Sequence, residues 1–405
     1  MEAGTIWLLL CAALVLFMTP GLAFFYGGLV KAKSVVSMMM LSFGAMGLVF
    51  VLWVLYGFNM GSNGSDLIDG WLANPFSDFA LSDMAKNDPA SLAGVAFGST
   101  FAVITTALIS GAVADRARFL PWMVFAGIWA TLVYFPSQGW VWGFDDEGLT
   151  GWIGTFTVGD ATPIDWAGGT VVHISAGAAA LALALVLGKR VTGFTKEDAV
   201  PHNVPLVLIG AAILWFGWFG FNTGAAVENG QGALIFLNTI VAPAAGLLGF
   251  VVIEHLKEGK ATAVGAASGV VAGLVAITPA CANLTPFWSI VLGLLAGIAC
   301  AFAIDLKYKL GYDDSLDVVG LHLVAGVLGC LYLGFFATDT GLFVGGNIDQ
   351  LVAQVVPVVV VMAYSFAVAF AVATVLDKTI GFRVKEEDEV AGIDTALHGA
   401  GYAFD

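Results

Sequence analysis

Residues 165–190 read DWAGGTVVHISAGAAALALALVLGKR, and this stretch decides how the rest of the chain is interpreted. It places His173 inside a long apolar segment, eight residues after an aspartate and four residues before a glycine. Residues 314–330, DSLDVVGLHLVAGVLGC, repeat these spacings around His322. An ionisable group at membrane depth is costly and usually lines an internal pathway. Two such groups in matched settings indicate a pore built from a duplicated unit.

The composition is that of a polytopic membrane protein. Of the 405 residues, 59% are hydrophobic and only 11% are charged, whereas soluble domains carry about 25% charged residues. The 51 glycines suit transmembrane helices that pack backbone against backbone. The four cysteines show neither a disulfide framework nor a metal-binding spacing, and the chain has no H-E-x-x-H or G-x-S-x-G motif. We therefore expect no metal site, no cofactor and no enzyme activity.

The fifteen basic residues fix the expected topology. All but one gather in six clusters, and the apolar sequence between successive clusters is long enough for two membrane crossings of about 20 residues each. With one further helix before Lys31, this predicts an all-α integral membrane domain of eleven transmembrane helices over residues 1–376, followed by a cytoplasmic tail over 377–405. Because basic clusters are cytoplasmic, the N-terminus is expected outside and the C-terminus inside. The predicted helices are 4–28, 35–58, 91–113, 120–141, 165–188, 204–225, 232–254, 262–281, 286–305, 316–337 and 351–375.

An odd number of helices in each half implies an inverted repeat. Helices 1–5 and 6–10 would be related by a two-fold axis in the membrane plane, with helix 11 outside the repeat. Helix 5 is predicted to begin at Asp165 and helix 10 near Asp314, so eight residues carry each histidine roughly 12 Å inward. In an apolar core of about 30 Å, His173 and His322 then differ in level by roughly 6 Å. The repeat is therefore expected to bring both rings together near the midplane.

Each of these polar groups also has a plainer structural explanation. A lone intramembrane histidine can simply bond a neighbouring carbonyl, but two at mirrored depth favour a shared pore. Asp165 can draw in a cation, or it can cap its helix by accepting hydrogen bonds from orphan backbone N–H groups. We favour capping for Asp165, and the same two interpretations apply to Asp314.

Several motifs together resemble the signature of the ammonium transporter family, the Amt, Mep and Rh group. The segment 165–190 carries one of them. The others are AFFYGGLVKAKSVVSMM at 23–39, GAVADRARF at 111–119, GWFGFNTGAA at 217–226, ITPACA at 277–282, DVVGLHLVAGVLGC at 317–330 and GFRVKEEDEVAGID at 381–394. The similarity runs nearly end to end and is closest to bacterial Amt-type transporters.

The resemblance implies an eleven-helix protomer that assembles as a homotrimer, with a narrow hydrophobic pore in each protomer. It also implies a multi-pass protein of the inner (plasma) membrane, with a PII-type regulatory protein docking on the cytoplasmic face; we expect no nucleic-acid partner. The chain departs from the family at Ala225 of the recruitment site, where a serine hydroxyl often stands, so one acceptor for ammonium is missing. The residues that match by motif are the pore histidines His173 and His322, the stacked outer phenylalanines Phe101 and Phe221, the recruitment-site aromatics Phe97 and Trp142, the pore-lining Trp218, and Asp165 near that site.

The cost of desolvation suggests how ammonium crosses an apolar pore. A bare cation loses several kcal/mol on leaving water, and a cation–π contact of about 2 kcal/mol offsets only part of this loss. Ammonium can release a proton and cross as ammonia, whereas potassium must keep its charge. We expect recruitment at the outer aromatic site, deprotonation near Phe101 and Phe221, and passage of ammonia along the histidines. The alternatives are an electroneutral gas channel of the Rh type, which would move ammonia or carbon dioxide, and an ammonium sensor that signals through a partner.

Overall fold

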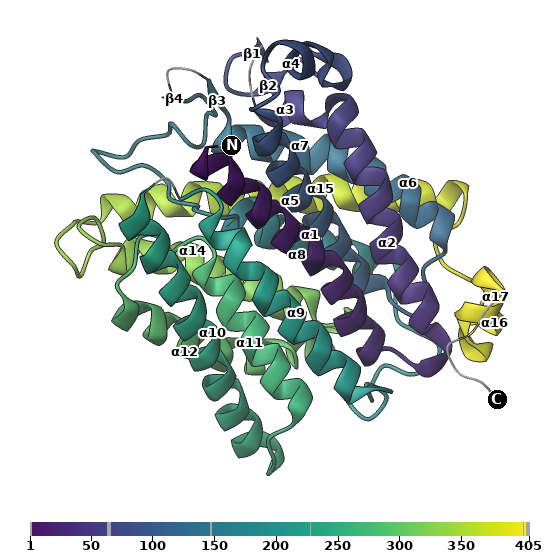
Figure 1. Cartoon of the computed structure of the whole chain (residues 1–405). Coiled ribbons are helices and arrows are strands. Elements are labelled where there is room, and N and C mark those ends of the chain that lie inside the picture. Colours follow the sequence, from purple (N-terminus) through teal and green to yellow (C-terminus); the bar gives the residue numbers. More distant parts are fainter. Residues whose placement is uncertain (1, 63–65, 146–147, 227, 400, 402–405) are drawn as a thin grey trace.

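The predicted membrane helices are all present in the structure, a computed structural model that describes every residue except 1, 63–65, 146–147, 227, 400 and 402–405. The last five of these residues belong to the predicted tail. Within the described residues, ten helical segments are long and apolar enough to cross a membrane. The eleventh, α11 (Ala263–Ile277), is apolar and 15 residues long. The all-α membrane fold with eleven helices is therefore confirmed (Figure 1).

The observed segments keep nearly the predicted boundaries, and several combine more than one helical element. In chain order they are α1 (Ala3–Leu29); η1 (Ala32–Ser34), α2 (Val35–Leu52), η2 (Trp53–Gly57) and α3 (Phe58–Ser62); α5 (Leu92–Ile109) and η4 (Ser110–Val113); α6 (Phe119–Trp129), η5 (Ala130–Tyr134) and α7 (Phe135–Trp142); η6 (Gly169–Ile174) and α8 (Ser175–Leu187); α9 (Val204–Thr223); α10 (Asn229–Glu258); α11; α12 (Pro286–Ala303) and α13 (Leu306–Leu310); η7 (Val319–Leu323) and α14 (Val324–Phe336); and α15 (Asp349–Thr379).

The first helix, α1, begins on the side of the bundle opposite the tail helices α16 and α17, as an odd number of crossings requires. Figure 1 shows the N-terminus on the same side as the strands, and the tail helices α16 and α17 near the C-terminus on the other side. Two antiparallel hairpins and one short helical pair fill the loops on the N-terminal side. These elements are β1 (Asp66–Ile68) with β2 (Leu72–Ala73), β3 (Phe144–Asp145) with β4 (Gly148–Leu149), and η3 (Phe79–Leu81) with α4 (Ser82–Asn87); the tail holds α16 (Glu386–Ala391) and α17 (Ile393–His398).

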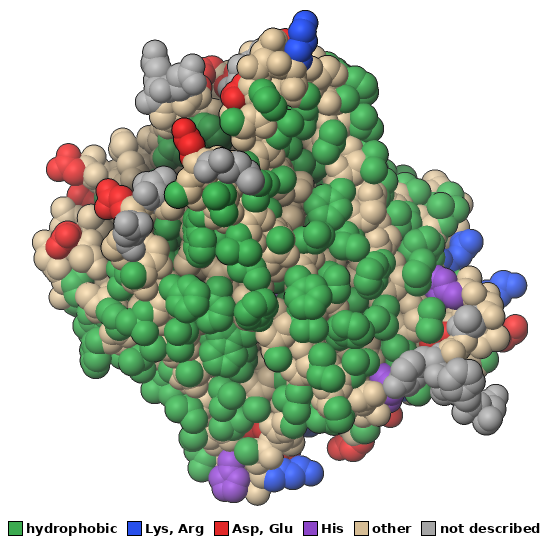
Figure 2. Space-filling view, viewed as in Figure 1, with side chains coloured by type: hydrophobic (Ala, Val, Ile, Leu, Met, Phe, Trp, Pro, Cys, Tyr) green, Lys and Arg blue, Asp and Glu red, His purple; other side chains and the backbone are tan. Residues whose placement is uncertain are grey.

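The outer surface of the bundle matches a membrane environment. Figure 2 shows hydrophobic side chains across the middle of the visible face, while the charged side chains gather along its edges. Large apolar residues such as Phe216 of α9 and Leu248 of α10 are more than half exposed. Such a belt is stable only against lipid or another apolar surface.

The two histidine-bearing segments cross closely and symmetrically. A Cβ atom added to Gly177, four residues after one histidine, would lie 2.6 Å from Cβ of Leu323, which follows the other histidine. A Cβ atom added to Gly326, the equivalent position in the second half, would lie 3.1 Å from Cγ1 of Ile174. A side chain at Gly177 would clash with Leu323, and one at Gly326 would press against Ile174, so glycine at both positions allows this approach. The reciprocal contact is the one expected where two inverted repeats meet.

Helices 5 and 10 begin later than predicted. Helix 5 begins with η6 at Gly169 rather than at Asp165, and helix 10 begins with η7 at Val319. Gly168 has φ +112° and Asp317 has φ +62°, left-handed backbone that ends any helix arriving from the preceding loop. Both helices open with a π-helical turn that carries the histidine. The predicted depth of 12 Å was therefore wrong in its premise, because the residues just after each aspartate are not helical.

Candidate functional site

Two buried imidazoles contact each other where helices 5 and 10 cross. The Nδ1 atoms of His173 and His322 lie 3.2 Å apart, and the ring centroids are 5.3 Å apart. The rings are almost fully buried. Because the same ring atom faces its counterpart, one histidine must donate and the other must accept, which gives the pair complementary tautomers. Within the part of the chain that the structure describes, no group of three or more potential metal ligands is found.

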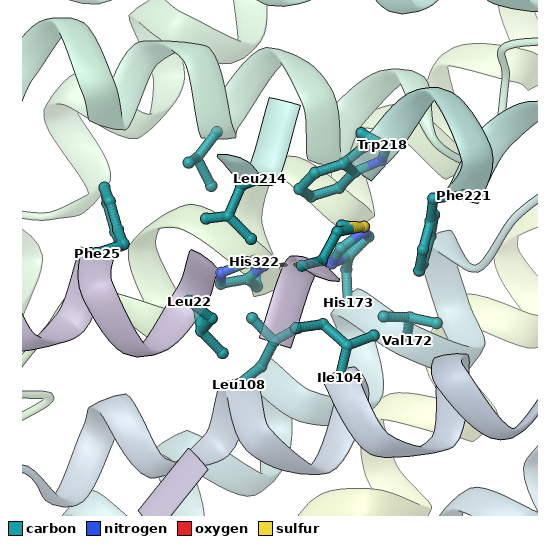
Figure 3. Close-up of a pocket in the computed structure, with 12 residues that line it drawn as sticks. Leu22, Phe25, Ile104, Leu108, Val172, His173, Leu214, Trp218, Phe221 and His322 are labelled. Atoms are coloured by element: carbon teal, nitrogen blue, oxygen red, sulfur yellow. Dashed lines mark hydrogen bonds between the residues drawn. The ribbon is translucent and has the colours of Figure 1, made fainter. Parts of the chain in front are cut away.

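A narrow cavity adjoins the histidine pair, and Figure 3 shows the side chains that surround it. The cavity leaves ≈ 10 Å³ for the centre of a water-sized sphere, about the least that one water molecule needs. The Trp218 ring stacks on His173 with centroids 5.5 Å apart, and its indole N–H is already bonded to Thr278 Oγ1 at 2.8 Å. The two imidazoles therefore supply the polar atoms in the lining of the cavity. The lining residues are Met18, Leu22, Phe25, Ile104, Leu108, Val172, His173, Leu214, Trp218, Phe221, Val271 and His322.

Stacked phenylalanines lie on the side of the cavity that faces the predicted outer surface. Phe221 lines the cavity, and the Phe101 ring stacks on it with centroids 4.0 Å apart and planes 15° apart. Phe97 meets Phe101 edge to face at 4.8 Å, and Trp142 meets it at 6.2 Å. The structure therefore brings together the four aromatic side chains that the motifs predicted for the outer gate and recruitment site.

The third predicted residue of the recruitment site, Ala225, lies beside this aromatic group. The Phe97 ring rests on Gly224, since a Cβ atom added to Gly224 would lie only 2.3 Å from Phe97 Cζ. Ala225 follows directly after this contact and is exposed. The half-buried rings of Phe97 and Trp142 therefore lie near an exposed position that offers a methyl group and no hydroxyl.

The carboxylate of Asp165 is fully engaged in capping helix 5. Oδ1 accepts hydrogen bonds from the N–H groups of Gly168 at 3.0 Å and Gly169 at 2.5 Å. Oδ2 accepts from the N–H groups of Thr170 at 2.9 Å and Val171 at 3.3 Å, and from the Thr170 hydroxyl. Four orphan N–H groups at a helix start deep in the protein thus find acceptors. This geometry favours capping over cation attraction.

Asp314 occupies the equivalent position at the inner end but is less completely bonded. Its Oδ2 accepts the Val319 N–H at 2.7 Å, and its backbone carbonyl accepts from Lys307 at 2.9 Å. Among the described residues, Oδ1 has no hydrogen-bond partner, and the side chain is buried. Burial raises the pKa of the Asp314 carboxyl to about 6, because Lys307 only partly offsets the loss of water. The Asp314 carboxyl therefore also caps its helix, but burial destabilises its charged form.

Two glutamines of helix 11 were not predicted as site residues. Gln354 Oε1 accepts the Ile164 N–H at 2.5 Å, and its Nε2 donates to the Ile164 carbonyl at 2.9 Å. Gln350 donates to the Thr162 carbonyl at 2.9 Å. Both side chains are buried. The sequence signal was available, since amides at positions i and i+4 interrupt an otherwise apolar helix.

The tail is docked on the loops at its own end of the helix bundle, which was not predicted either. Arg190 forms ion pairs with Asp313 at 3.0 Å and with Asp115 at 3.2 Å. Glu389 of α16 pairs with Arg383 at 2.7 Å, and it also accepts a backbone N–H from the loop after α8 at 2.6 Å. These contacts join three loops and the tail at the inner ends of the helices.

Comparisons with known proteins identify the family of the chain. The model of the Ammonium Transporter Family matches residues 6–402. An ammonium transporter of Mycobacterium bovis is 46% identical over an alignment of 434 positions that covers 99% of this chain and 90% of that protein. An ammonium transporter of Bacillus subtilis is 42% identical over 412 residues, covering 98% of each.

Solved structures show the same fold. A protein described as a Sensor Amt Protein superposes with a TM-score of 0.89 at 27% identity, covering 98% of both chains. Mep2 of Candida albicans superposes with a TM-score of 0.85 at 32% identity, covering 96% of this chain and 87% of that one. Members of this family are transporters and not enzymes. The chain is a multi-pass membrane protein that belongs to the Ammonium Transporter Family.

Proposed function

We propose that this protein takes up ammonium across the inner (plasma) membrane by recruiting it at an outer aromatic site, deprotonating it, and passing ammonia along paired histidines. The observation that carries the proposal is the contact between His173 and His322 in the wall of a narrow, otherwise apolar cavity. A small neutral molecule that can donate and accept hydrogen bonds fits this setting. A permanent cation does not.

The cost of charge burial explains the proposed selectivity. A cation in this cavity would lose its water shell, at a penalty of several kcal/mol after relaxation. The cavity is too small to admit the lost water along with the ion. Ammonium avoids the penalty by releasing its proton near Phe101 and Phe221. The proton crosses separately through the histidine pair and rejoins ammonia inside, so that one charge is carried, whereas potassium has no such route. Discrimination between ions of similar size then rests on acidity.

The outer aromatics would hold ammonium before it gives up its proton. The faces of Phe97 and Trp142 can attract the cation, a contact of about 0.5–2 kcal/mol depending on exposure. The stacked rings of Phe101 and Phe221 separate this site from the cavity. Because Ala225 supplies no hydroxyl, recruitment depends on the ring faces alone. The rings of the stack must move apart to let ammonia pass.

The histidine pair would offer one donor and one acceptor to ammonia. When one Nδ1–H donates to the other Nδ1, the donor ring keeps a lone pair on Nε2 and the acceptor ring keeps a hydrogen there. His173 Nε2 has no hydrogen-bond partner among the described residues. Ammonia can both donate and accept, so it can bond each ring as it passes.

Assembly and regulation extend the proposal. A homotrimer would cover part of the exposed apolar side chains of α9 and α10, such as Phe216 and Phe236. A PII-type regulatory protein would dock on the cytoplasmic face, where the tail helices α16 and α17 lie. Mass measurement in mild detergent tests the trimer. Co-purification with a PII-type protein from nitrogen-replete cells tests the partner.

The proposed function is tested by recording currents from proteoliposomes on a supported membrane. We expect a current on addition of ammonium and none on an equal addition of potassium. Ammonia entry without any current would favour the electroneutral gas channel. Ammonium binding without entry would favour a sensor. Equal currents for ammonium and potassium would refute the proposal.

A further inference from the structure

We propose that Gln354, on helix 11 outside the inverted repeat, positions the outer ammonium site by fixing the backbone between Ile164 and Asp165. This inference rests on the function proposed above. Gln354 does not reach the site itself. It acts through a loop whose carbonyl holds Trp142.

The side-chain amide of Gln354 bonds both the N–H and the carbonyl of Ile164. Oε1 accepts the Ile164 N–H at 2.5 Å, while Nε2 donates to the Ile164 carbonyl at 2.9 Å and to the Cys330 carbonyl at 3.0 Å. Gln350 Nε2 donates to Gln354 Oε1 at 3.2 Å. A reversed amide would set its NH₂ group against two donors and its oxygen against two carbonyls. One orientation is therefore fixed, and it is completely satisfied.

The backbone that Gln354 bonds is followed directly by the carbonyl that contacts the outer aromatic site. The carbonyl of Asp165 accepts the indole N–H of Trp142 at 2.7 Å. The Trp142 ring also lies against Gly168 of the same loop, since a Cβ atom added there would be 3.2 Å from Trp142 Cη2. Trp142 in turn meets Phe101 at 6.2 Å. A shift of the Ile164 peptide would therefore move the ring that we propose binds ammonium.

The loop needs this outside support because it cannot satisfy its own backbone. Residues 162–168 are not helical, and Pro163 lacks an N–H. Backbone groups buried without partners cost about 1–3 kcal/mol each. The side chain that satisfies the Ile164 peptide is fully buried on a neighbouring helix. Because a helix supplies these bonds, the Asp165 carbonyl that accepts the Trp142 N–H is held in a fixed position.

The test compares Gln354→Met, which keeps the side-chain length but removes every hydrogen bond, with the matched control Asn238→Leu. Asn238 is a buried amide of α10 whose Nδ2 donates to the carbonyls of Cys281 at 2.8 Å and Leu284 at 2.9 Å and not to the backbone of Ile164. Ammonium-evoked currents are recorded over a range of ammonium concentrations, and melting temperatures are measured in detergent. For Gln354→Met we expect a half-saturating concentration about 3- to 10-fold higher, with the maximal current within about 2-fold of wild type, as for a weakened cation–π contact.

Asn238→Leu should lower the melting temperature and leave the half-saturating concentration unchanged. In a Trp142→Leu background, where the half-saturating concentration is already raised, Gln354→Met should raise it no further, because both changes act through one ring. Should Gln354→Met fail to assemble, Gln354→Glu replaces it, since it keeps an acceptor for the Ile164 N–H and loses the NH₂ group that bonds two carbonyls.

An unchanged half-saturating concentration in the Gln354 variant, or full additivity with Trp142→Leu, would overturn the inference while leaving the proposed function intact. Absence of any ammonium-evoked current in the wild type would instead reject the proposed function.

Discussion

The capping of helix 5 by Asp165 can be tested by Asp165→Asn, which removes one acceptor oxygen and keeps the size of the side chain. Each carboxylate oxygen accepts at least two backbone N–H groups, Gly168 and Gly169 on one and Thr170 and Val171 on the other. Whichever oxygen becomes NH₂, two buried N–H groups lose their acceptor and face a donor.

The expected loss of stability follows from these counts. A buried donor left without its partner costs about 1–3 kcal/mol, and bonds to a charged acceptor lie at the upper end of this range. For Asp165→Asn we therefore expect a destabilisation of about 2–6 kcal/mol. At about 2–4 °C per kcal/mol, the melting temperature in detergent should fall by at least about 4 °C. Ammonium transport should fall as well, because the disturbed π-helical turn carries His173.

The control is Asp160→Asn, an exposed aspartate on the same side of the membrane. It removes the same charge from the outer face without removing a buried cap. We expect it to melt within about 1 °C of wild type, as is usual for surface changes. If Asp165→Asn melted like Asp160→Asn and lost only its affinity for ammonium, the carboxylate would be attracting the cation, and the capping argument would be refuted.

Three further predictions follow from the contacts described above. The pKa of Asp314 is raised from 3.8 to about 6 in the folded protein, so the stability associated with its protonated form is lost as the pH rises through about 6. At pH 7.5, Asp314→Asn should therefore have a higher melting temperature than wild type and be more stable by at most about 3 kcal/mol. The difference should shrink toward pH 4.5. Gly224→Ala places a methyl group 2.3 Å from Phe97 Cζ, and should raise the half-saturating ammonium concentration at least about 3-fold in current recordings; an unchanged value would mean that this ring is not part of the site. Glu389→Gln removes the buried partner of an ion pair whose Arg383 is partly exposed, so the loss should be smaller than the about 3–5 kcal/mol of a fully buried pair. Limited trypsin digestion should cut the tail faster than in wild type, and equal rates would show that the tail is held by other contacts.

The helices could be predicted from the sequence because each membrane crossing carries its own local signals, an apolar run of sufficient length and nearby basic residues. The two histidines could also be paired from sequence alone, since their matched spacing requires only that the halves be inverted repeats. The starts of helices 5 and 10 could not be predicted, because left-handed backbone at Gly168 and Asp317 depends on how the loops are held. A π-helical turn has no characteristic residue pattern that could be recognised within an apolar run.

Long-range polar contacts were the other feature beyond reach. Gln354 lies 190 residues from Ile164 in the chain, and nothing in the local pattern names its partner. The docking of Glu389 beside the loop after α8 is of the same kind. An amide or carboxylate in an unexpected place signals that a partner exists. Only the packing of the helices shows which one it is.

The most direct test of the central claim is the ammonium-to-potassium flux ratio of reconstituted protein in which His173 or His322 is replaced by alanine. Liposomes carrying each variant are compared with wild type under equal gradients of the two ions. We expect the wild type to pass ammonium and exclude potassium, and either replacement to abolish this selective flux. An unchanged ratio and rate in both variants would contradict the account.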